Sequence, residues 1–277
     1  MIRNLSSARC GRFATQLPPG ADDKASMNLG NALVNSCLHL FWPARCAGCD
    51  GILASDDAVF CGPCAQATLP IGNACAGCAL PQFGPRSRDR CPGCVRLDFG
   101  FSRAFAAFEY GGPLADAIVR MKHGDRPEMA RRLGRLLSGA VARAIEPAHG
   151  PPIDVVLPVP LHARKLRRRG FNQALVLTLS ALGRARLFSR SPVPRIERRL
   201  LVRVKETREL GRSGPGARRV ELYGAFAVSD PSRVVGRRFL LVDDVMTTGA
   251  TFSECADVLM RAGAKEVRVV ALARTLC

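Results

Sequence analysis

The sequence predicts an α/β fold: a domain built on a parallel sheet, preceded by a small cysteine-rich unit. Two observations support this. Four C-x-x-C pairs fall between residues 46 and 94, and beyond residue 101 strand-like and helix-like segments alternate, which is typical of a parallel sheet covered by helices. A chain of 277 residues with 47% hydrophobic content can also bury a full core and is long enough for two units of ~100–200 residues.

The N-terminal segment precedes both units. Residues 1–28 are polar and rich in Gly, Pro and Asp, and Met27 is a candidate start of translation. The stretch 29–42 is apolar enough to dock as a helix. We therefore expect residues 1–37 to form a flexible tail with a docking helix, without the compact apolar region of a secretory signal.

The four C-x-x-C pairs predict metal sites within residues 38–100. A gap of two residues lets both thiolates of a pair bind one tetrahedral ion, and two pairs complete a closed Cys₄ zinc site. The segment has few large apolar side chains, so we expect a double zinc ribbon held together by two structural zinc ions. Consecutive pairing of the motifs is favoured over a crossed arrangement, since each loop then closes over a shorter span. The predicted ligands are Cys46, Cys49, Cys61, Cys64, Cys75, Cys78, Cys91 and Cys94.

Disulfides are the competing interpretation of these cysteines. Disulfides form in oxidising compartments, whereas thiols stay reduced in the cytosol. The sequence shows no secretory signal and no run of about 18 apolar residues, which a membrane-spanning helix would need. We therefore expect a cytoplasmic protein without a membrane span. Redox C-x-x-C chemistry also fits four regularly spaced pairs poorly.

The second unit, residues 101–277, is expected to contain the parallel sheet. An apolar run ending in proline, at 153–160, predicts a buried strand, and the densest basic stretch of the chain follows it at 164–173 as a loop. By the same reading of periodicity, further strands are predicted at 102–110, from 239 onward and at 266–273, and helices at 113–121, 127–145, 174–185 and 251–262.

The clearest functional motif is the run from Phe239 to Thr251, FLLVDDVMTTGAT. It predicts a strand with two carboxylates at its solvent-facing end, then a Gly- and Thr-rich turn and a helix. Such a turn and helix N-terminus bind anions, and paired carboxylates accept hydrogen bonds from vicinal hydroxyls. The same pattern also occurs at ordinary connections between a strand and a helix. A nucleotide-triphosphatase loop is excluded, because the chain has no G-x-x-x-x-G-K-[ST] motif. We predict a ribose 5-phosphate site formed by Asp243, Asp244, Thr247, Thr248, Gly249, Ala250 and Thr251.

This run resembles the 5-phosphoribosyl 1-pyrophosphate (PRPP) motif of type I phosphoribosyltransferases. With the four Cys pairs and three further segments, the chain resembles the ComF family over roughly residues 38–275. The resemblance implies a type I phosphoribosyltransferase-like domain behind a double zinc ribbon, and an association with competence and DNA uptake in bacteria. The three segments are Lys122-His123-Gly124-Asp125, Val156 to Leu161 and Arg169-Gly170-Phe171-Asn172-Gln173.

The resemblance also implies roles for single residues. The two carboxylates would hold the ribose hydroxyls, and the Thr-rich turn would hold the 5-phosphate. The turn containing Val159 and Pro160 would approach the pyrophosphate, with Mg²⁺ chelated there. The basic stretch 164–173 would act as a flexible lid. The cations implied to complete the clamp are Lys122, Arg167 and Arg169.

Two functional hypotheses follow. In the first, the protein is a phosphoribosyltransferase, an enzyme of the pentosyl-transferring class, that uses PRPP and Mg²⁺. In the second, it is a non-catalytic zinc-ribbon protein that binds single-stranded DNA among DNA-uptake proteins and senses PRPP or a related ribose phosphate. A formal net charge of +18, most of it beyond residue 100, favours the second. So do Leu210 and Glu221, which stand where the family usually has Gln and Asn on the acceptor side.

Overall fold

The fold was analysed in a computed structural model of the chain. The described residues are 43–82, 90–95, 99–123, 126–186, 193–206 and 221–276. The expected tail and docking helix at 1–37 lie outside them, as do Gly124, Asp125 and Leu210. Residues 44–277 form one compact unit that contains the sheet and all eight paired cysteines. The expected boundary between ribbon and domain at residue 100 stays a prediction.

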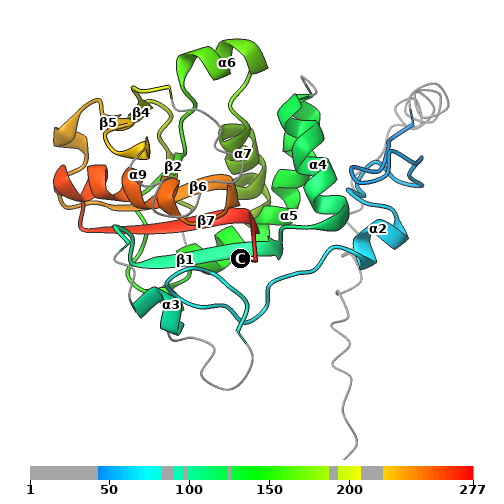
Figure 1. Ribbon diagram of the computed structural model, residues 1–277, viewed down its shortest axis with the longest axis horizontal. Coiled ribbons are helices and arrows are strands. Elements are labelled where there is room, and N and C mark those ends of the chain that lie inside the picture. Colours follow the sequence, from blue (N-terminus) through cyan, green and yellow to red (C-terminus); the bar gives the residue numbers. More distant parts are fainter. Residues whose placement is uncertain are drawn as a thin grey trace, which may run out of the picture. The chain divides into compact units, whose positions relative to one another are not determined.

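The centre of this unit is a five-stranded parallel sheet with the order β1-β7-β6-β2-β3 (Figure 1). The predicted α/β class is therefore confirmed. The central strands β6 and β7 each contain a continuous apolar run, as expected for strands that are covered on both faces. The strands span Arg103–Glu109 (β1), Val155–Pro158 (β2), Arg195–Ile196 (β3), Arg238–Met246 (β6) and Glu266–Arg274 (β7).

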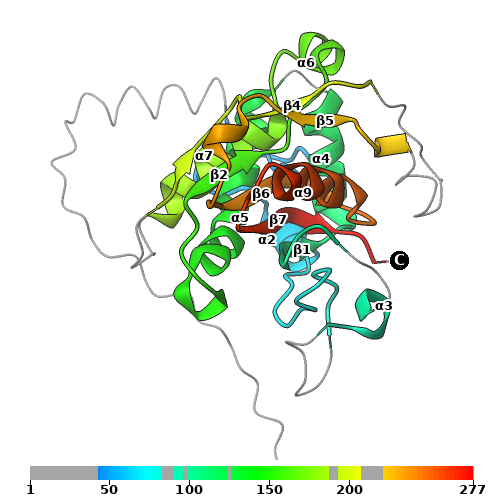
Figure 2. The same ribbon diagram turned by 90° about the vertical axis from the view of Figure 1, so that its left-hand side faces the viewer.

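Helices cover both faces of the sheet (Figure 2). Side chains alternate along a strand, so Leu240 and Val242 pack with helices α4, α5 and α7, whereas Phe239 and Leu241 pack with α9 on the other face. None of the described helices is both long and apolar enough to cross a membrane. The helices span Gly62–Gln66 (α2), Pro92–Val95 (α3), Gly112–His123 (α4), Pro127–Ile145 (α5), Gln173–Ala185 (α7) and Ala250–Arg261 (α9), with 3₁₀ turns at Pro147–His149 and Pro231–Arg233.

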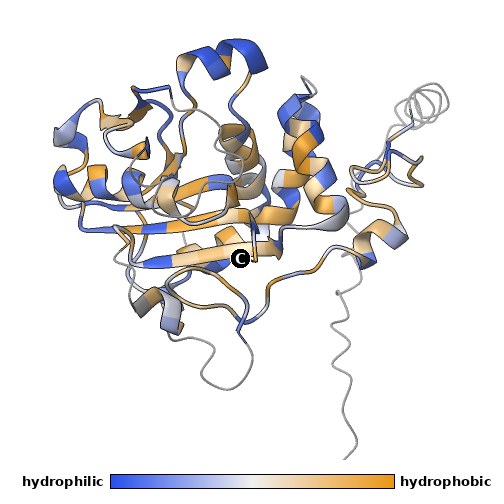
Figure 3. Cartoon of the chain, in the orientation of Figure 1, coloured by the Kyte–Doolittle hydropathy of each residue, from blue (hydrophilic) through white to orange (hydrophobic). Residues whose placement is uncertain are grey.

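Two parts of the fold differ from the sequence-based expectation. The basic stretch expected as a loop contains a short helix, α6 (Ala163–Arg169), because His162 accepts a hydrogen bond from the Arg164 N–H at its start and left-handed Gly170 ends it. This helix is hydrophilic in Figure 3 and stands away from the sheet. The strand pattern also misses β3 and a two-stranded antiparallel sheet, because each of these strands is three residues long or shorter. The small sheet pairs Leu201–Arg203 (β4) with Phe226–Val228 (β5).

The two cysteine-rich segments attach to opposite faces of the sheet. The first packs on α4 and α5, where Arg132 donates hydrogen bonds to the carbonyl oxygens of Arg45 and Ala58 at 2.7 and 2.6 Å. The second contributes Cys75 and Cys78 to the core on the α9 face. Each cysteine-rich segment is therefore tied to the sheet domain by its own set of contacts.

Candidate functional site

A pocket of about 390 Å³ opens at the carboxyl ends of β2, β6 and β7, the edge where parallel sheets bind ligands. It gathers side chains from α4, α6 and the strand ends, which are far apart in the sequence. Most of the predicted site residues line it. These are Lys122, Val159, Pro160, Arg169, Asp243, Asp244, Thr247 and Thr251.

The remaining predicted residues, Thr248, Gly249 and Ala250, belong to the turn at residues 247–251, which we call the phosphate loop after its predicted role. The Thr248 hydroxyl accepts a hydrogen bond from the Ala250 N–H at 3.4 Å. Gly249 caps α9 with a φ of 81°, a conformation that favours glycine. A Cβ atom at Gly249 would also lie 2.9 Å from Cε of Met246. The turn therefore needs glycine at this position for both its backbone angle and its close packing.

The two carboxylates occupy different environments. Asp244 is 3% exposed, and its Oδ2 lies 3.0 Å from Nζ of Lys122. Asp243 is half-buried, and its Oδ1 accepts a hydrogen bond from the Asp244 N–H at 2.8 Å. The expectation that both carboxylates face solvent is wrong for Asp244, because α4 brings Lys122 over the end of the strand.

Burial and charge set the protonation of these groups. Burial, and after it the charge of Asp244, raises the pKa of Asp243 to about 8. Burial opposes the charge of Lys122, but Asp244 and then Asp243 raise the pKa of its ammonium group above the ordinary value. Near neutral pH the charge of Lys122 is therefore fixed, whereas the charge of Asp243 responds to what binds beside it.

Arg169 belongs to the pocket rather than to the basic surface. Arg169 is 8% exposed, and its guanidinium donates a hydrogen bond to Oε1 of Gln173 at 2.6 Å. Lys165 of the same helix also lines the pocket. Arg167 and Arg168 are exposed and lie outside the lining. Of the cations implied for α6, the structure brings Arg169 to the pocket and leaves Arg167 outside it.

Several lining residues escape the sequence-based prediction. Tyr110 and Thr275 directly follow β1 and β7. Parallel sheets bind ligands at the carboxyl ends of their strands, and this strand-end rule, which predicted the carboxylates, could have predicted these two residues as well. Arg203 belongs to the small β4-β5 sheet, which the strand pattern missed, and its guanidinium carbon lies 5.3 Å from the ring centroid of Phe226. Glu221, one of the two departures from the family pattern, also lines the pocket.

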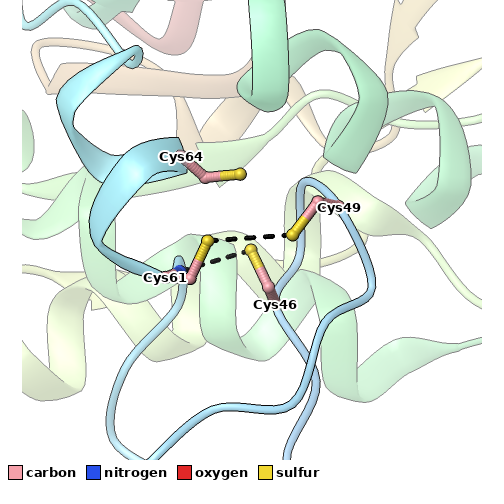
Figure 4. Close-up of side chains that lie close together, drawn as sticks. All are labelled: Cys46, Cys49, Cys61 and Cys64. Atoms are coloured by element: carbon pink, nitrogen blue, oxygen red, sulfur yellow. Dashed lines mark hydrogen bonds between the residues drawn. The ribbon is translucent and has the colours of Figure 1, made fainter.

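The eight paired cysteines form two clusters, and within each cluster the sulfur atoms lie within 4.8 Å of one another. In the first cluster the sulfur atoms converge from a loop and from the start of α2 (Figure 4). The consecutive pairing of the motifs is confirmed, and four convergent sulfur atoms fit a tetrahedral ion. The first cluster consists of Cys46, Cys49, Cys61 and Cys64, and the second of Cys75, Cys78, Cys91 and Cys94.

Each cluster contains one thiol whose pKa is lowered towards the thiolate, the form of cysteine that binds metal, whereas burial and hydrogen bonds to neighbouring thiols raise the pKa of the other shifted cysteines. A hydrogen bond from the thiol of Cys78, joined by the Cys91 N–H at 3.1 Å, lowers the pKa of Cys75 to about 4. Burial raises the pKa of Cys46, but backbone N–H donors, including that of Cys61 at 3.3 Å, outweigh it and lower the pKa to about 6. The donor chemistry of both clusters therefore suits a divalent ion such as zinc.

The raised pKa of Asp243 predicts how stability depends on pH. Folding raises this pKa from 3.8 to about 8, so the stability that the protonated carboxyl provides is lost as pH rises between these values. Asp243→Asn keeps an acceptor for the Asp244 N–H but carries no charge. We expect this variant to have a higher melting temperature than the wild type at about pH 8.5, where each kcal/mol of added stability raises Tm by about 2–4 °C. The difference in Tm between the two proteins should shrink towards about pH 6.

Differential scanning calorimetry across this range measures the effect. Asp244→Asn is the contrasting variant, because it leaves Lys122 without its partner and should melt below the wild type. An Asp243→Asn variant that melts below the wild type at about pH 8.5 would contradict the raised pKa.

Comparison with known proteins gives consistent results. A family model described as a phosphoribosyl transferase domain matches residues 190–277. DNA utilization protein YhgH of Escherichia coli is 32% identical over 234 residues, covering 84% of this chain and 98% of that protein. Competence protein F of Haemophilus influenzae is 29% identical over 238 residues, covering 86% of this chain and 93% of that protein. Competence protein ComFC of Streptococcus pneumoniae is 26% identical over 224 residues, covering 80% and 91%.

Among solved structures, the glutamine PRPP amidotransferase of Bacillus subtilis matches 51% of this chain at 21% identity with a TM-score of 0.31, and this chain spans 25% of that one. The identity to the E. coli protein extends over nearly the whole of that relative. The chain therefore belongs to the family of DNA utilization protein YhgH and competence protein F, the ComF family that its motifs resemble.

Proposed function

We propose that the protein binds PRPP together with Mg²⁺ in the pocket at the ends of β2, β6 and β7 and acts as a phosphoribosyltransferase. The observation that carries this proposal is the convergence of carboxylates, threonine hydroxyls and cations in one pocket of about 390 Å³. The match of residues 190–277 to a phosphoribosyl transferase domain supports it.

Each part of PRPP has a matching group. The amides of the phosphate loop and the hydroxyls of Thr247 and Thr251 donate to the 5-phosphate. Asp243, the more exposed carboxylate, accepts hydrogen bonds from the ribose hydroxyls. The backbone at Val159 and Pro160 lies beside the pyrophosphate. Asp244 has a different role, which is to hold Lys122 in place through their ion pair.

The reaction is a displacement at C1 of the ribose. The bond from C1 to the pyrophosphate oxygen breaks as the bond to an acceptor forms, and positive charge develops on the sugar. The protein contributes mainly positioning and charge stabilisation. Lys122 and Arg169 bind the departing pyrophosphate, and Mg²⁺, when bound, neutralises part of its charge. Glu221 and Arg203 also line the pocket, and we assign the acceptor to their side of it.

Titration calorimetry with PRPP and Mg²⁺ tests the proposal. Arg169→Gln should weaken binding by about 10-fold or more, because a hydrogen bond to a charged group contributes about 1.5–3 kcal/mol. Arg167→Gln is the matched control, since it removes the same charge from an exposed position on the same helix, and it should bind nearly as the wild type does. Equal affinities for the wild type and both variants would count against the pocket, and release of pyrophosphate measures turnover.

We further propose that both Cys₄ clusters hold structural zinc. Elemental analysis should find two zinc ions per chain. Cys49→Ser removes an exposed ligand of the first cluster and should leave one ion per chain, because the other cluster keeps all four thiolates. Cys255→Ser alters a buried thiol outside both clusters and should retain two ions. Purified protein without zinc would refute this assignment.

The helix α6 favours a second function, the binding of single-stranded DNA. Its exposed Arg167 and Arg168 face solvent beside the pocket-lining Lys165, and the names of the relatives refer to DNA utilization and competence. We propose that α6 binds the DNA backbone in the cytoplasm, among proteins of DNA uptake, and that the same protein senses PRPP or a related ribose phosphate.

The salt dependence of DNA binding tests this second function. Each contact with a phosphate of a single strand contributes roughly −0.7 to the slope of log affinity against log salt, so Arg167→Ala with Arg168→Ala should flatten the slope by about 1.4. Arg198→Ala with Arg199→Ala removes another adjacent exposed pair and should change it less. Fluorescence anisotropy with a labelled oligonucleotide measures both. Unchanged slope and affinity in the α6 variant would show that this helix is only a solvated surface.

A further inference from the structure

Arg274, the last residue of β7, connects the second cysteine cluster to the phosphate loop. Arg274 is 5% exposed. Nε donates to the carbonyl oxygen of Cys78 at 2.7 Å, and a terminal nitrogen donates to the carbonyl oxygens of Met246, at 3.2 Å, and Thr247. One guanidinium therefore holds a carbonyl of the metal cluster and two carbonyls where the chain enters the phosphate loop.

The Cys78 carbonyl is fixed by the turn that builds the metal site. The Ala79 N–H donates to the carbonyl oxygen of Cys75, and the Cys75 N–H donates to that of Leu80, both at 2.9 Å. Ala79 lies in the left-handed region with a φ of 57°. The conformation that turns two sulfur atoms towards one ion thus also directs the Cys78 carbonyl at Arg274. Opening the cluster would release this turn.

A second contact joins the same two parts. A Cβ atom at Gly249 would lie 3.2 Å from Cε1 of Phe99, so Phe99, which follows the second cluster, packs directly on the phosphate loop. Phe99 stacks on Phe101 with ring centroids 4.8 Å apart, and the Gly100 N–H donates to Oγ of Ser253 in α9 at 3.3 Å. The segment after the cluster therefore supports the turn into α9.

A guanidinium transmits position because it is rigid. Its donors lie in one planar fork, so Arg274 cannot follow a displaced Cys78 carbonyl and keep its bonds to Met246 and Thr247. The carbonyls of these two residues set the direction of the amides that follow them. The alignment of the phosphate loop therefore depends on a closed second cluster.

The first cluster is connected differently. Arg120 of α4 donates to the carbonyl oxygen of Ala47 at 3.3 Å, and Arg132 of α5 donates to that of Ala58 at 2.6 Å. These contacts lie on the opposite face of the sheet from the second cluster. They lead to α4, which carries Lys122, and to α5 rather than to the phosphate loop, so the first cluster is the comparison for an effect that runs through Arg274.

We propose that Arg274 is a positioning residue for the PRPP site and that it couples metal binding at the second cluster to ligand binding at the phosphate loop. This inference rests on the proposed PRPP function. Coupling is reciprocal, so each ligand strengthens the binding of the other by the same factor. The first cluster stays independent of PRPP.

Site-resolved alkylation of the zinc-loaded, full-length protein tests the coupling. A zinc-selective chelator and N-ethylmaleimide are added with or without PRPP and Mg²⁺, and mass spectrometry assigns the labelled cysteines. PRPP should slow labelling of the second cluster by about 5-fold or more, the usual lower range of allosteric coupling. Labelling of the first cluster should not change. Equal protection of both clusters, or protection of neither, would overturn the proposal.

A matched pair of variants tests the role of Arg274. Arg274→Lys keeps the charge, but a single ammonium group cannot reach Cys78 and the loop carbonyls together. Arg268→Lys is the control, because Arg268 is fully buried on the same strand and donates to the carbonyl oxygens of Ala144 and Pro151. The first variant should lose the selective protection and the second should keep it. Circular dichroism checks that both variants fold. The comparison of the two clusters in the wild type does not depend on either variant.

Hydrogen exchange separates this proposal from the proposed function. Calorimetry first establishes whether the wild type binds PRPP, and a lack of binding would refute the proposed function. Exchange at the amides of 247–251 is then measured without ligand. It should be faster in Arg274→Lys than in the wild type or in Arg268→Lys. Unchanged exchange in Arg274→Lys would refute the role of Arg274 whether or not PRPP binds.

Discussion

The ion pair between Lys122 and Asp244 is the interaction on which the pocket depends. Asp244 is the second of the two carboxylates that follow the apolar run of β6 and is almost fully buried, so its charge must be compensated there. A buried ion pair adds little net stability compared with a hydrophobic pair of equal size. Removing one partner of a fully buried pair costs about 3–5 kcal/mol. The cost is smaller here because Lys122 is partly exposed. The main effect of the ion pair is positional: it holds α4 and a cation at the ligand-binding edge of the sheet.

The sequence predicts those features that depend on neighbouring residues. The long strands β1, β6 and β7 follow from the local pattern of apolar residues, and consecutive Cys pairing follows from loop length. The strand-end rule also places the carboxylates in the pocket. It does not predict that Asp244 is buried, because that depends on α4, more than a hundred residues earlier. It cannot predict β4 and β5 either, because strands of three residues carry too little pattern.

Part of the positive charge stabilises the fold and is not available at the surface. Arg132, Arg268 and Arg274 all donate to backbone carbonyl oxygens of distant segments. A guanidinium presents five donors in a fixed plane and can join several carbonyls at once, which a lysine cannot do. Net charge alone therefore overstates the area available for nucleic acid. The exposed arginines of α6 are a more specific basis for such a surface.

The cysteine-rich segments also serve the pocket in a way that their motifs do not reveal. The first cluster has a small apolar core of its own, formed by Cys46, Leu53 and Cys64, whereas Cys75, Cys78 and Cys94 of the second lie within the core of the sheet domain. A knuckle that shares its core with α9 cannot move independently of the helix at whose N-terminus we propose that phosphate binds. The second cluster is therefore built into the part of the fold that carries the pocket, whereas the first cluster packs around a small core of its own.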